Sequence, residues 1–260
     1  MDQFNLNHSR RSFIKGMALT GAAVTCIPVM ESFALPTNSG RKIKAGKGFV
    51  FLFQGDSITD GNRGRTKDPN HIMGHGYAFS IASRLGADLP EKQFTFYNRG
   101  ISGNRVSDLA ARWQGDTLDL KPDVLSILVG VNDTGSVVYQ REPVVTIEKY
   151  EEGYKALLDQ TLANNPDIIL VLCEPFILSV GRVKEKWELY HPDLVKRQSV
   201  VRKLASRYNT VFVGFQEVFD SACKKAPADY WIWDGVHPTV AGHELMAREW
   251  LKQVGKRISF

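Results

Sequence analysis

The chain of 260 residues contains only three cysteines, and none stands at the spacing of a zinc or iron site. This scarcity excludes a disulfide-stapled scaffold and a cysteine-based metal module. Blocks of one charge are also missing, because 33 basic residues are interspersed with 28 acidic ones. The net charge of +5 is therefore weak evidence for nucleic acid, and we expect no nucleic-acid partner. Whether Cys173 and Cys223 pair stays open at this point.

An apolar run of the roughly 20 residues that a membrane-spanning helix needs is missing as well. The uncharged stretch over residues 16–30 is too short for a comfortable span. It follows SRRSFIK (residues 9–15), which is typical of twin-arginine export signals, and it precedes a small-x-small cleavage site at 32–34. We therefore predict a signal peptide over 1–34 and a periplasmic or extracellular mature protein without a stable membrane span. The alternatives are a short helix of the mature fold or a lipoprotein signal, for which the residues before Cys26 fit poorly.

The rest of the chain predicts one domain with a polar lead-in. Hydrophobic residues make up 43% of the sequence, which is ordinary for a globular protein. Residues 35–48 are polar and basic, and we expect them to be flexible. We expect a single domain over 49–260, without internal repeats.

Short apolar runs alternate with helical patterns throughout this domain. The predicted strands lie at 49–53, 94–97, 123–129, 168–173 and 210–213. The predicted helices lie at 76–89, 106–113, 145–163, 195–208 and 240–254. Continuous apolar strands separated by helices indicate a parallel sheet covered on both faces. The predicted fold class is therefore α/β, a three-layer α/β/α sandwich with a mostly parallel sheet of about five strands, whose ligands bind at the carboxyl ends of the strands.

Ser57 directly follows the first predicted strand, on the edge of the sheet where ligands bind. A serine there can be an exposed nucleophile if a base lies beside it. Taken alone, it is equally typical of a helix N-cap. The Gly-x-Ser-x-Gly elbow of α/β-hydrolases is absent, because Thr59 stands at the position of its second glycine.

Asp234 and His237 form the candidate base, just ahead of the last predicted helix. In a turn, this spacing lets the Asp234 carboxylate reach Nδ1 of His237, which leaves Nε2 free to take a proton from Ser57. The pair alone is also compatible with a capping turn that carries a surface histidine.

Two glycine- and asparagine-rich loops follow the second and third predicted strands, at 98–104 and 130–135. The first can bring a backbone N–H close to a ligand, and the second offers the amide of Asn132. Such donors stabilise the oxyanion of acyl transfer. Each loop alone is an ordinary turn.

Taken together and in order, these segments resemble the four sequence blocks of the SGNH, or GDSL-type, hydrolase superfamily. The blocks are Gly55-Asp56-Ser57, Asn98 to Gly103, Gly130-x-Asn132-Asp133 and Asp234-x-x-His237. The resemblance extends from about residue 49 to 250. It implies a flavodoxin-like sandwich and an ester hydrolase.

The resemblance also implies roles for individual residues. Ser57 would be the nucleophile, His237 the general base and Asp234 its orienting partner. The oxyanion hole would consist of the Ser57 N–H, the Gly103 N–H and the Asn132 side chain. The motif aspartates that would brace the loops are Asp56, Asp60 and Asp133.

No metal or organic cofactor is required by such a mechanism, and we expect none. His71 and His75 are four residues apart, but Gly74 and Pro69 argue against the helix that would turn them to one side as zinc ligands.

The superfamily includes lipases, thioesterases and carbohydrate esterases, so membership does not identify the substrate. The residues of the loops near the predicted site narrow the choice of substrate class. The residue pattern is also similar to bacterial acetylxylan- and rhamnogalacturonan-acetylesterases. Aromatic and basic side chains near the predicted site suit stacking on sugar rings, and the candidates are Arg63, Trp187, Tyr190 and Trp233.

We therefore predict a carboxylic ester hydrolase that removes short acyl groups, above all acetyl, from a carbohydrate or another small ester. One alternative is an exported lipase, lysophospholipase or thioesterase with the same triad. Another is a carbohydrate-binding protein without turnover. The sequence does not name the sugar, the acylated position or the oligomeric state.

Overall fold

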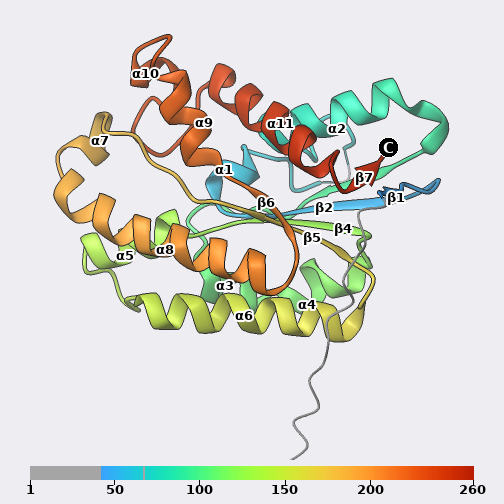
Figure 1. The fold of residues 1–260 in the computed structure, drawn as a ribbon, viewed down its shortest axis with the longest axis horizontal. Helices are drawn as coiled ribbons and strands as arrows, with labels where there is room; N and C mark the ends of the chain where they lie inside the picture. The colour runs from blue at the N-terminus through green and yellow to red at the C-terminus, as the bar shows by residue number, and fades with distance from the viewer. Residues whose placement is uncertain (1–41, 67) are drawn as a thin grey trace, which may run out of the picture. The chain divides into compact units, whose positions relative to one another are not determined.

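The structure, a computed structural model, describes residues 42–66 and 68–260. The predicted signal peptide over 1–34 and the start of the lead-in lie outside the described residues. A parallel sheet runs through the middle of the described part (Figure 1), and its strands are ordered β3-β2-β4-β5-β6. These strands are β2 (Val50–Gly55), β3 (Thr95–Asn98), β4 (Val124–Leu128), β5 (Ile169–Cys173) and β6 (Val211–Val213).

The predicted fold class is confirmed. Every neighbouring pair in this sheet is parallel, and each predicted strand is present within a few residues. Strands β4 and β5 are buried along their whole length, as expected when helices cover both faces of a parallel sheet.

One face of the sheet packs against α2 (Tyr77–Asp88), α9 (Phe215–Ala222) and α11 (Val240–Val254), which lie above it in Figure 1. Phe51 and Phe53 of β2 point to this side, and the Phe53 ring lies 5.5 Å from that of Trp250 in α11. The Trp250 indole also donates to the Ser126 hydroxyl at 3.0 Å, which satisfies a polar group in the centre of β4.

The opposite face packs against α3 (Val106–Ala111), α4 (Trp113–Asp116), α6 (Ile147–Asn164) and α8 (Trp187–Arg207). Leu52 of β2 points to this side, as the alternation of side chains along a strand requires. Tyr150 and Tyr154 form the buried stripe of α6 together with Leu157 and Leu158, as the sequence periodicity predicts.

Short elements at the strand ends complete the described part. They are α1 (Ser57–Asp60), η1 (Pro90–Lys92), η2 (Leu118–Leu120), α5 (Val131–Val138), α7 (Gly181–Lys184) and α10 (Ala228–Trp231). The lead-in expected over 35–48 contains a strand, β1 (Ile43–Lys44), which pairs in parallel with β7 (Ile258–Ser259). Backbone pairing and the complete burial of Ala45 hold this stretch against the domain.

Helix α8 begins at residue 187, earlier than the predicted start at 195, and Pro192 lies inside it. Proline removes one backbone hydrogen bond from a helix, which makes it a plausible boundary in a sequence. Here the buried side chains of Tyr190, Leu194 and Arg197 lie on both sides of Pro192 and hold the helix continuous. Tertiary packing therefore overrides the local preference.

Among the described residues, none of the helices combines the length and apolar character that a membrane-spanning segment requires. Cys173 and Cys223 are both free, Cys173 being buried in the sheet and Cys223 half-buried at the end of α9.

Candidate active site

Ser57 lies just beyond the carboxyl end of strand β2, at the first position of the short helix α1. The chain turns sharply before it, because Asp56 caps α1 by accepting the Ile58 N–H at 3.0 Å. Gly55 makes this turn possible: a Cβ there would come within 2.3 Å of the Leu128 carbonyl oxygen. The half-buried Ser57 is thereby presented at the edge of the sheet where ligands bind.

His237 reaches Ser57 from the turn before α11, whose N-cap is Thr239. His237 Nε2 lies 2.8 Å from Ser57 Oγ, and its Nδ1 lies 2.8 Å from Asp234 Oδ2. The other oxygen of Asp234 accepts the backbone N–H groups of His237 at 2.7 Å and Val236 at 3.0 Å. The turn therefore holds the carboxylate in place with two backbone bonds before it orients the imidazole.

The charge of Asp234 is strongly favoured in this turn. Burial works against ionisation, but the hydrogen bonds from His237 and Val236 outweigh it and hold the pKa of Asp234 well below its ordinary value. A charged carboxylate keeps the proton on Nδ1, which leaves Nε2 as the acceptor facing Ser57. The arrangement can therefore remove a proton from the serine hydroxyl.

The residues predicted to donate to an oxyanion lie in the loops after β3 and β4. Asn132 lies in the first turn of α5, and its Nδ2 donates to the Asn104 carbonyl at 3.2 Å. Gly103 has φ = 85°, a left-handed conformation that suits glycine. Both residues line one cavity of about 300 Å³, which we call the catalytic-edge cavity.

Asp60 and Asn98 tie the nucleophile loop to the loop that carries Gly103. Asp60 Oδ2 accepts from the Ser102 N–H at 3.0 Å and from Arg65 Nη2 at 2.6 Å. Burial opposes its charge, but the hydrogen bonds from Arg65 and Ser102 lower the pKa of Asp60. The Asn98 side chain donates to the backbone oxygens of Thr59 (2.7 Å) and of Met73 (3.0 Å). These bonds fix the spacing between the first two sequence blocks.

Asp56 and Asp133 lie beneath the site and are buried. Burial raises the pKa of Asp56 to about 7, and it raises the pKa of Asp133 to about 6 against the opposing charge of Arg197. Asp133 Oδ1 accepts the Val106 N–H at 3.1 Å and so links α5 to the start of α3. The second carboxyl oxygen of each aspartate has no hydrogen-bond partner in the described part of the chain.

The four predicted substrate contacts lie in different settings. Trp233 is 64% exposed, and its ring lies 6.4 Å from that of His237 at an interplanar angle of 23°. Tyr190 is buried, yet it lines the catalytic-edge cavity. Trp187 stacks on His191 and packs against the core, and Arg63 donates from Nε to the Gly100 carbonyl at 2.9 Å. Trp233 and Tyr190 are thus beside the site, whereas Trp187 and Arg63 have contacts within the fold.

Three residues near the site were not predicted from the sequence: Arg105, Arg141 and Arg182, all of which line the catalytic-edge cavity. Arg182 Nη2 lies 3.3 Å from Asp234 Oδ2. None of the three belongs to a sequence block, so no local signal could have found them. In the parts of the chain that the structure covers, no group of three or more His, Cys, Asp or Glu side chains could hold a metal ion.

Comparisons with known proteins identify the family of the chain. Residues 53–245 match the model of the GDSL-like lipase/acylhydrolase family. The acetylxylan esterase of Geobacillus stearothermophilus is 34% identical over 218 residues, which cover 82% of this chain and 97% of that protein, and its crystal structure superposes with a TM-score of 0.72. A GDSL-like lipase structure from Parabacteroides merdae is 43% identical with a TM-score of 0.79, covering 83% of this chain and all of that one.

A lipoprotein of Bacillus subtilis, YqeF, is 31% identical over 139 residues, about half of either chain. The family match begins within β2 and includes strands β3 to β6, the candidate serine and the turn of Asp234 and His237. The two solved structures cover 83% and 82% of this chain. The chain therefore belongs to the GDSL-like lipase/acylhydrolase family and is an esterase of the acylhydrolase class.

Proposed function

We propose that this protein is a serine esterase that hydrolyses short-chain esters, chiefly O-acetyl esters, of carbohydrates. The observation that carries the proposal is the continuous relay from Ser57 Oγ through His237 to Asp234, with 2.8 Å at each hydrogen bond. Such a relay on a hydrolase fold is the arrangement that nucleophilic acyl transfer needs.

In the first half-reaction, Ser57 Oγ attacks the ester carbonyl carbon while its proton moves to His237 Nε2. The oxyanion accepts hydrogen bonds from the N–H groups of Ser57 and Gly103 and from Asn132 Nδ2. The tetrahedral intermediate then collapses, its C–O bond to the alcohol breaks, and His237 gives its proton to the leaving sugar oxygen. An acyl-serine remains.

In the second half-reaction, water takes the place of the alcohol. His237 removes a proton from this water, whose oxygen attacks the acyl carbon, and the same donors hold the oxyanion. Collapse releases the carboxylic acid and returns the proton to Ser57. Asp234 stabilises the imidazolium in both halves and stays ionised throughout.

Two features support a short acyl group on a sugar. The catalytic-edge cavity is lined by arginine, tyrosine, asparagine and serine side chains, which suit a polar ligand better than a fatty-acyl chain. The exposed ring of Trp233 lies beside His237, where a sugar could stack on it. The similarity to an acetylxylan esterase points in the same direction. We also propose that the protein is exported through the twin-arginine segment. This segment lies within residues 1–34, which are outside the described structure.

The experiment compares the hydrolysis of p-nitrophenyl acetate and octanoate, together with acetate release from acetylated xylo-oligosaccharides. We expect kcat/KM to be at least tenfold higher for the acetate ester, because the cavity offers little apolar surface. Ser57→Ala should lower kcat by on the order of 10⁴-fold or more. Ser199→Ala, an exposed serine on α8, is the matched control and should leave the rate unchanged.

Faster hydrolysis of octanoate would replace the carbohydrate esterase with a lipase or thioesterase that uses the same relay. Acetate release that persists in Ser57→Ala would remove the catalytic assignment of Ser57. A native protein that binds the oligosaccharides but releases no acetate would instead favour a carbohydrate-binding protein.

A further inference from the structure

The catalytic-edge cavity begins at the proposed oxyanion donors and is unusually basic. Gly103 and Asn132 line it together with Arg105, Arg141 and Arg182. The arginines come from three elements: Arg105 is the N-cap of α3, Arg141 follows α5, and Arg182 lies in α7. No acidic residue is among the described residues that line the cavity.

Two of these arginines have no carboxylate within ion-pair distance in the described part of the chain, although the charge of Arg105 acts on the buried Asp133. Within the described residues, Arg105 and Arg141 form no ion pair. Arg105 Nη1 donates to the neutral carbonyls of Pro143 at 2.5 Å and Arg141 at 3.4 Å. The guanidinium of Arg141 lies over the ring of Tyr139, 4.8 Å from its centroid.

A further cation lies near the cavity arginines, and the carboxylate of the neighbouring Glu142 is hydrogen-bonded to the backbone. Lys186 Nζ lies 4.8 Å from the centroid of the same Tyr139 ring. Glu142, the residue next to Arg141, turns its carboxylate back onto the Val144 N–H at 3.1 Å. Only Arg182 has a carboxylate partner among the three cavity arginines of the described chain, and that partner is Asp234 of the relay. Like charges gathered in a concave site raise one another's free energy and attract an anion.

The polar groups between the arginines suit an anion too. Burial raises the pKa of Tyr190 to about 12, so its hydroxyl keeps its proton and can donate a hydrogen bond. The guanidinium fork matches the two oxygens of a carboxylate. A neutral acetylated sugar would fill the same space but leave these donors facing no negative charge.

Building on the proposed function, we propose that the preferred ester substrate carries a carboxylate, which Arg105 and Arg141 bind in the catalytic-edge cavity while the scissile carbonyl lies at Gly103 and Asn132. The carboxylate can stand on either side of the ester. On the alcohol side it belongs to an acidic sugar, a uronic acid next to or bearing the acetyl group. On the acyl side it is the free end of a dicarboxylic half-ester.

The experiment measures kcat/KM for two matched substrate pairs. The first pair is an acetylated xylo-oligosaccharide with and without a glucuronic acid branch, and the second is the succinyl and butyryl ester of the same alcohol. For each pair, kcat/KM of the acidic ester is divided by kcat/KM of the neutral ester, so a general loss of catalysis cancels in this ratio. We expect a ratio of at least ten for one pair in the native enzyme, which identifies the side that carries the carboxylate, and a fall in this ratio as salt screens the charges.

Three variants test the origin of the preference. Arg141→Gln should lower the ratio about tenfold, and Arg141→Glu should lower it further, because it replaces attraction by repulsion. Arg141 is exposed, so neither change disturbs the core. Arg207→Gln is the matched control: Arg207 also lies over a tyrosine ring, that of Tyr208, at the end of α8. It should leave both the ratio and the activity unchanged.

Ratios below two for both pairs would overturn the inference, as would ratios that are the same in the native enzyme, Arg141→Gln and Arg141→Glu. Either result leaves the proposed esterase intact as long as the neutral acetyl ester is still hydrolysed. If the native enzyme hydrolysed none of these esters, the result would instead count against the proposed function.

Discussion

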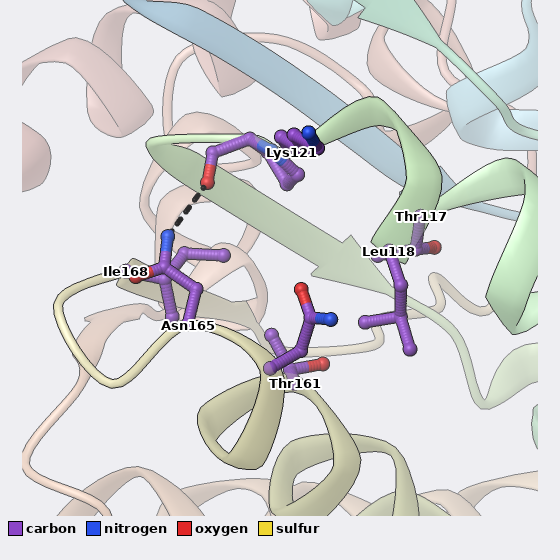
Figure 2. A pocket seen from close by; sticks show the side chains of 8 residues that line it. Thr117, Leu118, Lys121, Thr161, Asn165 and Ile168 are labelled. Atoms are coloured by element: carbon purple, nitrogen blue, oxygen red, sulfur yellow. Dashed lines mark hydrogen bonds between the residues drawn. The ribbon is translucent and has the colours of Figure 1, made fainter.

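Two cavities of about 300 Å³ each lie at opposite ends of the same sheet. The catalytic-edge cavity is formed by loops that follow β3 and β4. The other, which we call the opposite cavity (Figure 2), is formed by residues that precede β4 and β5. Its lining is Thr117, Leu118, Lys121, Pro122, Thr161, Asn164, Asn165 and Ile168.

The two cavities have equal volume but different chemistry. The lining of the opposite cavity carries a single charged side chain, Lys121, among the described residues, and its amides and hydroxyls largely serve the fold. Thr161 there accepts from the Trp113 indole at 3.1 Å, and Asn165 Nδ2 donates to the Pro122 carbonyl at 3.4 Å. At the catalytic edge, Gly103 and Asn132 line the cavity together with three arginines, on the side of the sheet where Ser57 follows β2. Volume alone therefore does not locate the site in this fold, whereas the direction of the strands does.

The largest expected difference between the two ends comes from Asp234→Asn. In this variant the two backbone N–H groups hold the amide oxygen, so the amide NH2 faces Nδ1 of His237 and donates a hydrogen bond to it. The imidazole then carries its proton on Nε2, which can no longer accept one from Ser57. We expect kcat to fall by on the order of 10⁴-fold at neutral pH. Asp119→Asn, in η2 beside the opposite cavity, should leave kcat unchanged. A loss of less than tenfold in Asp234→Asn would contradict the orienting role.

A second comparison uses one asparagine from each cavity. Asn132→Ala removes a proposed oxyanion donor and should lower kcat by about 10²- to 10³-fold with little change in KM. Asn164→Ala, in the opposite cavity, should change kcat by less than twofold. Steady-state kinetics of both variants on the acetate ester give the answer. Equal effects would mean that the catalytic edge holds no special donor at residue 132.

The smallest expected effect concerns stability rather than rate. The pKa of Asp56 is about 7 in the folded chain against 3.8 as its ordinary value, so the folded state keeps a proton that the unfolded state loses in between. The stability that the Asp56 carboxyl contributes is fully present below its pKa in the unfolded state, and it is lost as the pH rises through its pKa in the folded state. Between pH 5 and pH 8 this amounts to roughly 2 to 3 kcal/mol.

Asp56→Asn keeps an oxygen for the Ile58 N–H but carries no titrating proton. The free energy of unfolding of this variant, minus that of the native chain, should therefore rise by roughly 2 to 3 kcal/mol from pH 5 to pH 8. Thr161→Val, at the opposite cavity, should shift stability equally at both pH values, because a hydroxyl does not titrate there. Urea denaturation at pH 5 and pH 8 measures the free energy of unfolding of both variants and of the native chain. If the difference between Asp56→Asn and the native chain did not change with pH, the Asp56 carboxyl would titrate normally in the fold.

Much of the fold could be predicted because its signals are local. The strands are short apolar runs, and the three-residue spacing of Asp234 and His237 already fits one turn, which the structure forms with two backbone bonds. The position of Ser57 followed from the strand before it and from the rule that ligands bind at the carboxyl ends.

The cavity arginines could not be predicted, because their proximity is a product of topology. Arg105, Arg141 and Arg182 lie on separate elements, and nothing in the residues around each one refers to the others. The basic residue that the sequence analysis proposed as a substrate contact, Arg63, donates to the Gly100 carbonyl in the fold.

The bond between Ser57 and His237 joins residues that are 180 positions apart. Parallel sheets form through long-range contacts, which makes their folding slow relative to proteins with local contacts. A chain that ends before His237, whether still on the ribosome or cut by a protease, holds the proposed nucleophile without its proposed base. Ester hydrolysis therefore returns after denaturation only when both ends of the domain have folded. The recovery of activity can be used to follow the completion of folding.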